Sequence, residues 1–150
     1  MEDCLICSRI KMIGEGTNKY FVKELETGYA VLGDHQYFEG YTLFLGKEHK
    51  RELHELDSGY KQKFLRDMSI VAEAVHHAFK PHKLNYELLG NGDAHMHWHI
   101  FPRSLNEPNP THPVWWTPRE VMYSDDYRPD EARLADLKNK LLTELNRLAD

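Results

Sequence analysis

Three histidines stand at every second position in residues 95–103: His95, His97 and His99. Alternate side chains of an extended strand share one face and lie roughly 6.5 to 7 Å apart. We therefore expect the three imidazoles on one face of a strand, with the intervening apolar side chains in the core: Met96, Trp98 and Ile100. Such a strand would be a rigid support for a row of imidazoles.

A row of neutral imidazoles suits the transfer of a phosphorus-containing group. Imidazole has a reference pKa of about 6.5, so near pH 7 it can attack without a base that removes a proton. Attack on phosphorus gives a phospho-imidazole, which water or another acceptor can break. Neighbouring imidazoles can hold the phosphoryl oxygens and protonate the leaving group. The alternative is a harmless row of histidines on a solvent-exposed face.

Only two cysteines are present, Cys4 and Cys7 in the segment Cys-Leu-Ile-Cys. A pair at this spacing is typical of a metal clip or a redox pair rather than of a structural disulfide. A redox role is disfavoured, because no helix start is expected close after Cys7 to lower the pKa of a thiol. Two free thiols remain the alternative to a metal clip.

The elements that must position these residues follow from the periodicity of the chain. Apolar runs predict strands over residues 20–25, 29–33 and 41–46, with a turn at 26–28 and a loop at 34–40. A helical period then begins near residues 57–58 and ends at Pro81. Its apolar positions are Phe64, Met68, Val71, Val75 and Phe79.

A hairpin is expected next, because predicted strands over 84–89 and 94–101 flank a tight turn at 90–93. This hairpin would place the histidines on a central pair of strands. Residues 104–127 are expected to form an ordered but irregular covering loop, which contains Pro108, Pro110, Pro113, Trp115, Trp116 and Pro118. A final amphipathic helix begins near Pro129 and is marked by Leu134, Leu137, Leu141, Leu145 and Leu148.

The composition predicts one globular domain over 150 residues, of which 41% are hydrophobic and 29% are charged. No apolar run approaches the roughly 20 residues of a membrane helix. Residues 1–4 lack the basic start and apolar middle of a signal peptide, so we expect a cytoplasmic protein. The formal net charge is −5 and no stripe of Lys and Arg is present, so we expect no nucleic-acid partner.

The chain resembles the histidine-triad (HIT) superfamily of nucleotide hydrolases and transferases, whose signature is His-x-His-x-His followed by two apolar residues. Residues 95–101 match that signature in full. The flanking matches occur in the expected order: Cys4-x-x-Cys7, Asp34, Gly40, Lys47-Glu48-His49, the long helix, Asn85, Asn91-Gly92 and Pro102-Arg103. The resemblance covers about residues 1–103, and residues 104–150 would add a C-terminal loop and helix to the same domain.

The resemblance implies an α+β fold with a mainly antiparallel sheet of about five strands, usually paired as a homodimer. His97 maps to the nucleophile, which attacks the α-phosphorus of a nucleoside phosphoramidate or a dinucleoside polyphosphate. Water then releases the monophosphate from the nucleotidyl-histidine. His99 maps to a second catalytic histidine beside the phosphate, which supports the phosphate or acts as the acid. Asn85 and Asn91 map to polar positions near it, and Asp34 to a carboxylate that accepts the ribose hydroxyl protons.

Some members of the superfamily contain a metal, and the resemblance to them also implies a zinc site in this chain. The matching residues are Cys4, Cys7, His49 and His95. Two thiolates and two imidazoles suit a closed tetrahedral structural site. His95 would then orient its neighbours and take no direct part in the chemistry.

Two departures from the family pattern bear on the site. Many relatives have Gly-His before the third strand, where this chain has Gly40-Tyr41, so a contact to the triad is altered. The turn before the triad is also shorter, which affects the leaving-group contacts. Nucleotidyl transfer to another acceptor, or a nucleotide-binding scaffold stabilised by zinc, are the alternatives to hydrolysis.

Two further features stay open. Trp115 and Trp116 could stack on a base or cover the sheet as a lid. Arg103 could meet the phosphate or bond a carboxylate.

Overall fold

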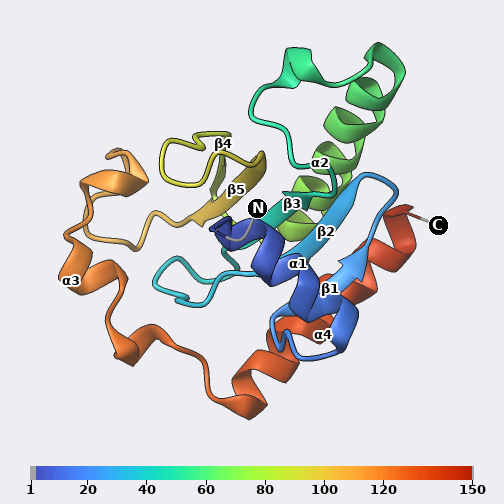
Figure 1. Ribbon diagram of the computed structural model, residues 1–150. Helices are drawn as coiled ribbons and strands as arrows, with labels where there is room; N and C mark the ends of the chain where they lie inside the picture. The colour runs from blue at the N-terminus through green and yellow to red at the C-terminus, as the bar shows by residue number, and fades with distance from the viewer. Residues whose placement is uncertain (1–2, 150) are drawn as a thin grey trace.

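The computed structural model describes residues 3–149 and shows an α+β fold built on one antiparallel sheet (Figure 1). The sheet order is β1-β2-β3-β5-β4, and each neighbouring pair is antiparallel. The strands are β1 (Phe21–Glu24), β2 (Gly28–Leu32), β3 (Thr42–Gly46), β4 (Lys83–Glu87) and β5 (His97–Arg103). The predicted fold class and the predicted five strands are confirmed.

Helices cover both faces of the sheet (Figure 1). The long helix α2 (Ser58–Phe79) and the C-terminal helix α4 (Glu131–Ala149) pack together on one face. Helix α1 (Leu5–Glu15) lies over the other face, and the segment that contains α3 (Arg119–Met122) continues around that side. Single turns of 3₁₀-helix occur at Leu53–Glu55, Val114–Trp116 and Asp125–Tyr127. No helix within residues 3–149 combines the length and apolar composition that crossing a membrane requires.

The alternation in β5 assigns its side chains to two faces. Trp98 lies opposite Phe44 of β3, and Phe64 of α2 packs against both rings, with centroids 6.4 Å and 5.8 Å away. Trp98 therefore faces the α2 layer, as predicted. His97 and His99 point to the opposite face, because successive side chains of a strand alternate.

The last predicted strand differs from the observed one at both ends. The structure places His95 before β5, because its imidazole donates to the carbonyl of Gly46 at 2.6 Å. Met96 also lies before β5, and its backbone N–H donates to the carbonyl of Lys50 at 2.8 Å. The strand instead runs on through Pro102 to Arg103. It is an interior strand, but its partner β4 is at the sheet edge, so the pair is not central.

Helix α1 was not predicted, and the expectation of no helix start near Cys7 is wrong. The helix begins at Leu5, and the Sγ of Cys4 accepts the N–H of Cys7 at 3.3 Å as an N-cap. It ends at Gly16, whose φ of 73° is left-handed. Cysteine is not among the residue types that commonly cap helices, so the start signal was weak.

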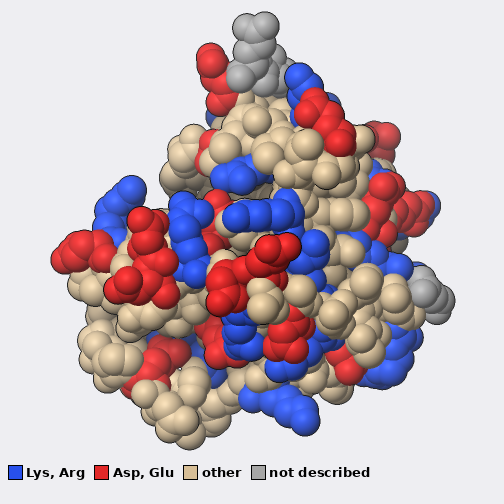
Figure 2. Space-filling view, turned by 90° about the horizontal axis from the view of Figure 1, so that it is seen from below, with Lys and Arg blue, Asp and Glu red and all other residues tan. Residues whose placement is uncertain are grey.

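Charged residues are mixed on the surface rather than separated. Figure 2 shows Lys and Arg side chains beside Asp and Glu side chains on the face seen from below. On α4, Asp136 pairs with Arg133 at 2.9 Å and with Lys140 at 3.3 Å. This face therefore presents no continuous basic surface.

Asp67 of α2 is the buried link between that helix and the β1–β2 turn. Its carboxylate accepts the backbone N–H of Thr27 at 3.0 Å and the Thr27 hydroxyl at 2.6 Å, and the Thr27 side chain is fully buried. Hydrogen bonds to an ionised group stabilise a fold more than neutral ones, and an abandoned buried donor is costly. The pair therefore fixes the turn against α2.

We expect Asp67→Ala to lower the free energy of unfolding by about 2 to 3 kcal/mol, because both Thr27 donors lose their acceptor. Urea denaturation followed by circular dichroism measures the change. Glu73→Ala, on the exposed side of the same helix, is the matched control and should change stability by less than about 0.5 kcal/mol. Equal effects of the two substitutions would contradict this role of Asp67.

Candidate active site and metal centre

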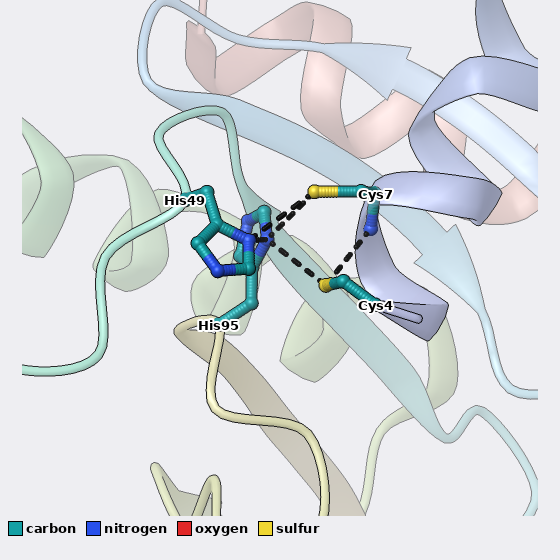
Figure 3. Close-up of side chains that lie close together, drawn as sticks. All are labelled: Cys4, Cys7, His49 and His95. Atoms are coloured by element: carbon teal, nitrogen blue, oxygen red, sulfur yellow. Dashed lines mark hydrogen bonds between the residues drawn. The ribbon is translucent and has the colours of Figure 1, made fainter. Parts of the chain in front are cut away.

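Two cysteines and two histidines from distant parts of the chain converge on one point (Figure 3). The Nδ1 atom of His95 lies 3.5 Å from the Sγ of Cys4 and 3.5 Å from the Sγ of Cys7. The Nδ1 atom of His49 lies 3.3 Å from the Sγ of Cys7 and 3.1 Å from Nδ1 of His95. All four ligand atoms lie within 4.8 Å of one another. The structure thus brings together all four residues predicted from the sequence.

The proton positions in this cluster favour the binding of a metal cation. Nε2 of His95 must donate to the Gly46 carbonyl, because a carbonyl oxygen only accepts. Neutral His95 therefore turns the lone pair of Nδ1 toward the thiols and His49. In a tetrahedral zinc site with ordinary bond lengths, neighbouring ligand atoms are about 3.3 to 3.8 Å apart, close to the separations found here. The donor set and its geometry fit zinc.

Burial, followed by the hydrogen bond and charge of Cys4, raises the pKa of the Cys7 thiol. The thiol is therefore poorly suited to the nucleophilic role of a redox cysteine, although it lies in the first turn of α1. A bound cation would favour the thiolate form of both cysteines.

His97 is buried with only 7% of its surface exposed, and its tautomer is fixed by the backbone. Its Nδ1 atom lies 2.7 Å from the carbonyl oxygen of His95 and must carry the proton of that bond. The lone pair of neutral His97 is therefore on Nε2. An imidazole held in this way can act as a nucleophile at Nε2, while the carbonyl stabilises the positive charge that attack creates.

His99 is the neighbour of His97 on the same face, and the two ring centroids are 4.9 Å apart. Burial, and to a lesser extent the charge of His97, lowers the pKa of His99 to about 4. His99 is therefore neutral at physiological pH. The hydroxyl of Tyr41 lies 2.7 Å from its Nδ1 atom. Residue 41 departs from the family pattern in the sequence, but its contact with His99 was not predicted.

A cleft of about 250 Å³ lies beside the histidines, between α1, the strands β2 and β3, and α3. Its wall is apolar over most of its extent, and Asp34 and His35 are among its polar lining residues. Arg9 of α1 binds the carboxylate of Asp34 at 3.1 Å. Tyr41 lines the cleft as well as contacting His99, so it connects the two regions.

The two asparagines predicted near the phosphate have different surroundings. Asn85 of β4 accepts a hydrogen bond from Arg103 at 2.8 Å. Asn91 is exposed in the turn before β5, and its side chain makes no hydrogen bond within residues 3–149. The structure therefore does not join either amide to His97 or His99 by a hydrogen bond.

Arg103 bonds a carboxylate, which decides between the two roles left open for it. It is 5% exposed and donates to Glu107 through Nε at 2.9 Å and also through Nη2. Its Nη2 also donates to the carbonyl of Asn109 at 3.3 Å. Arg103 thus holds the start of the C-terminal segment against the sheet.

Trp115 covers the histidine face as a lid. Its ring stands edge-on to His99 at 5.6 Å and to Phe101 at 5.7 Å, and its Nε1–H donates to Glu87. Trp116 is 69% exposed and contacts His112 instead. The lid interpretation is therefore confirmed for Trp115 and not for Trp116.

Comparison with known proteins agrees with this geometry. The HIT domain family matches residues 16–106. The Hit protein of Bacillus subtilis is 29% identical over 135 residues, which are 87% of each chain. A histidine triad protein from Marinobacter aquaeolei has a TM-score of 0.72 and 25% identity, covering 86% of this chain and 90% of that chain.

Two more distant structures share the fold and have informative descriptions. A zinc-bound histidine triad family protein from Mycobacterium smegmatis has a TM-score of 0.65 and 18% identity, covering 98% of this chain and 96% of that chain. Diadenosine triphosphate hydrolase from Plasmodium falciparum has a TM-score of 0.58 and 13% identity, covering 88% and 80%. With the family match spanning well over half of its length and the triad on β5, the chain belongs to the HIT domain family.

Proposed function

We propose that this protein hydrolyses nucleotides at the α-phosphate, with dinucleoside polyphosphates or nucleoside phosphoramidates as substrates and His97 as the nucleophile. The observation that carries the proposal is the bond from Nδ1 of His97 to the His95 carbonyl, which leaves a lone pair on Nε2. The description of the Plasmodium falciparum relative as a diadenosine triphosphate hydrolase supports it. Because the turn before the triad departs from the family pattern, the proposal includes both the polyphosphate and the phosphoramidate leaving groups.

The reaction takes two displacement steps. Nε2 of His97 attacks the α-phosphorus, and the bond from phosphorus to the leaving oxygen or nitrogen breaks with its electron pair on the leaving group, which takes up a proton from solvent. Water then attacks the same phosphorus and loses a proton to solvent. The bond between phosphorus and Nε2 breaks, which restores the lone pair and releases the nucleoside monophosphate.

The other site residues contact the substrate in this proposal. His99, neutral and half-buried, supports the phosphoryl oxygens beside His97. Asn85 and Asn91 supply polar contacts near the phosphate after local rearrangement. The nucleoside occupies the apolar cleft, where Asp34 binds the ribose hydroxyls.

We further propose that zinc is bound by Cys4, Cys7, His49 and His95, as a structural ion. The geometry of the four ligand atoms and the zinc-bound relative from Mycobacterium smegmatis support this assignment. Bound zinc would neutralise the negative charge of the two thiolates and would link α1 to the start of β5. It would take no part in the displacement steps.

The location, oligomeric state and partners of the protein are also proposals. We propose a cytoplasmic homodimer whose partners are small nucleotides, without a nucleic-acid partner. The edge strand β4 supports an interface between two copies, because Tyr86 is 50% exposed there and Leu89, which follows it, is 51% exposed. The mixed surface charge and the net charge of −5 support the absence of a nucleic-acid partner.

His97→Ala should reduce the release of AMP from adenosine 5′-phosphoramidate and from diadenosine tetraphosphate at least about a hundredfold, because no other group takes the place of the nucleophile. Chromatography of the products measures the rates, and circular dichroism checks that the variant is folded. His76→Ala, on the exposed side of α2, is the matched control. A folded variant that kept a tenth of the wild-type rate would exclude His97 as the nucleophile.

The same assay tests the alternatives. Formation of a new nucleotide when phosphate or a sugar phosphate is added would indicate transfer. Tight nucleotide binding without AMP release from the wild type would indicate a binding scaffold.

Protein purified without chelator should contain about one equivalent of zinc by elemental analysis. Cys4→Ser should lose most of that zinc and unfold at a lower denaturant concentration, because a ligand and the link through α1 are lost. Ser8→Ala, an exposed neighbour on α1, serves as the control. A zinc content below about a tenth of an equivalent in the wild type would reject the site.

The partly buried environment of His99 predicts an unusual titration. Its imidazole should remain neutral down to about pH 4, because burial and His97 disfavour the cation. Since the unfolded chain binds this proton near pH 6.5, His99 should reduce the stability of the folded state as the pH falls from about 6.5 toward 4. An NMR titration of the ring protons measures the midpoint, with exposed His54 as the control. A midpoint above pH 6 for His99 would contradict its burial.

A further inference from the structure

The ring of Tyr41 is held firmly in the site. Its backbone N–H donates to the carbonyl of Phe38 at 2.9 Å, and its carbonyl accepts from the backbone N–H of Gly33 at 2.9 Å and from Nε2 of Gln36 at 3.0 Å. A Cβ atom at residue 33 would overlap the Tyr41 ring, so the glycine there makes room for it. The ring also stacks on Phe101, with centroids 4.1 Å apart and planes 11° apart.

The direction of the bond between Tyr41 and His99 follows from the surroundings of the hydroxyl. Burial, followed by the charges of Tyr123, Asp34 and Glu87, raises the pKa of Tyr41 above its usual range, so the phenol keeps its proton. Within residues 3–149 the hydroxyl has no hydrogen-bond partner other than Nδ1 of His99. If His99 donated instead, the phenol proton would have no acceptor among the described residues. The hydroxyl therefore donates, and neutral His99 carries its proton on Nε2.

We propose that Tyr41 is a positioning residue, which holds His99 as the Nε2–H tautomer so that this N–H is a fixed donor to the phosphoryl oxygens. The inference rests on the proposed function, because it assigns His99 a role in the same reaction. It gives the two neighbouring imidazoles complementary tasks. His97 presents a lone pair at Nε2, since its proton is engaged by the His95 carbonyl, and His99 presents an N–H.

A neutral donor suits the space beside the nucleophile. A protonated His99 would place a second positive charge 4.9 Å, between ring centroids, from the imidazolium that His97 becomes during attack. The neutral N–H stabilises negative charge on the phosphoryl oxygens without that repulsion. Tyr41 thus selects one of two neutral forms of His99 and adds no charge to the site.

Tyr41→Phe tests the proposal, because it removes the hydroxyl and keeps the ring that packs on Phe101. For adenosine 5′-phosphoramidate, we expect kcat to fall about tenfold and KM to stay within about threefold, since a donor used mainly in the transition state is loosened. Two-bond ¹H–¹⁵N NMR spectra should show His99 as the Nε2–H form in the wild type and as a mixture of tautomers in the variant. His99→Gln identifies the His99 signals by their absence.

Tyr37→Phe is the matched control. Tyr37 lies in the same loop and packs edge-on against Phe38 and Tyr127, and its hydroxyl makes no hydrogen bond in the described chain. This substitution should leave kcat, KM and the His99 spectrum unchanged.

Three results would overturn the proposal. An unchanged His99 spectrum in Tyr41→Phe would show that another group sets the tautomer. A changed spectrum with unchanged kcat would show that the tautomer does not matter for turnover. A rise in KM at constant kcat would show that Tyr41 binds substrate instead. If the wild type released no AMP at all, the proposed function would fail, whereas the spectrum would still report whether Tyr41 fixes His99.

Discussion

His95 links the cysteine and histidine cluster to His97, through its imidazole on one side and its backbone carbonyl on the other. Its imidazole donates to Gly46 and turns Nδ1 toward the cysteines, while its backbone carbonyl accepts the proton of His97. The first bond is made by a residue that lies just before β5, and the second sets the tautomer of His97. A change in the cluster that moved the backbone at His95 would therefore also move the acceptor that holds His97.

The cluster and the cleft are connected through α1. Cys4 caps this helix and Cys7 lies in its first turn, and Leu5, Ile6 and Arg9 of the same helix form one wall of the cleft. The remaining walls come from β2, β3 and α3. The position of α1 thus affects the cleft, although no cysteine faces it.

The sequence was informative where a pattern has a simple physical cause. The spacing of the histidines predicted one shared face for His97 and His99, because side chains alternate along a strand. The apolar period of α2 predicted that helix, which ends as expected before Pro81. Helix α1 was missed because its cap is a sulfur atom, and the place of His95 was wrong because a side chain to backbone bond overrides the strand. The contact of Tyr41 with His99 depends on the close approach of Gly33, a long-range packing contact that no local sequence pattern predicts.

The C-terminal segment lies outside the part of the chain that matches the HIT domain family, yet it lines the cleft. Trp115 covers His99, and Met122 and Tyr123 close one side of the cleft, yet all three residues follow the stretch matched by the HIT domain family. Arg103 holds the start of this segment through Glu107 and Asn109, outside the row of histidines. Changes at Met122 and Tyr123 would therefore alter one wall of the cleft without replacing any residue of the histidine row, so under the proposed function substrate range and chemistry can change independently.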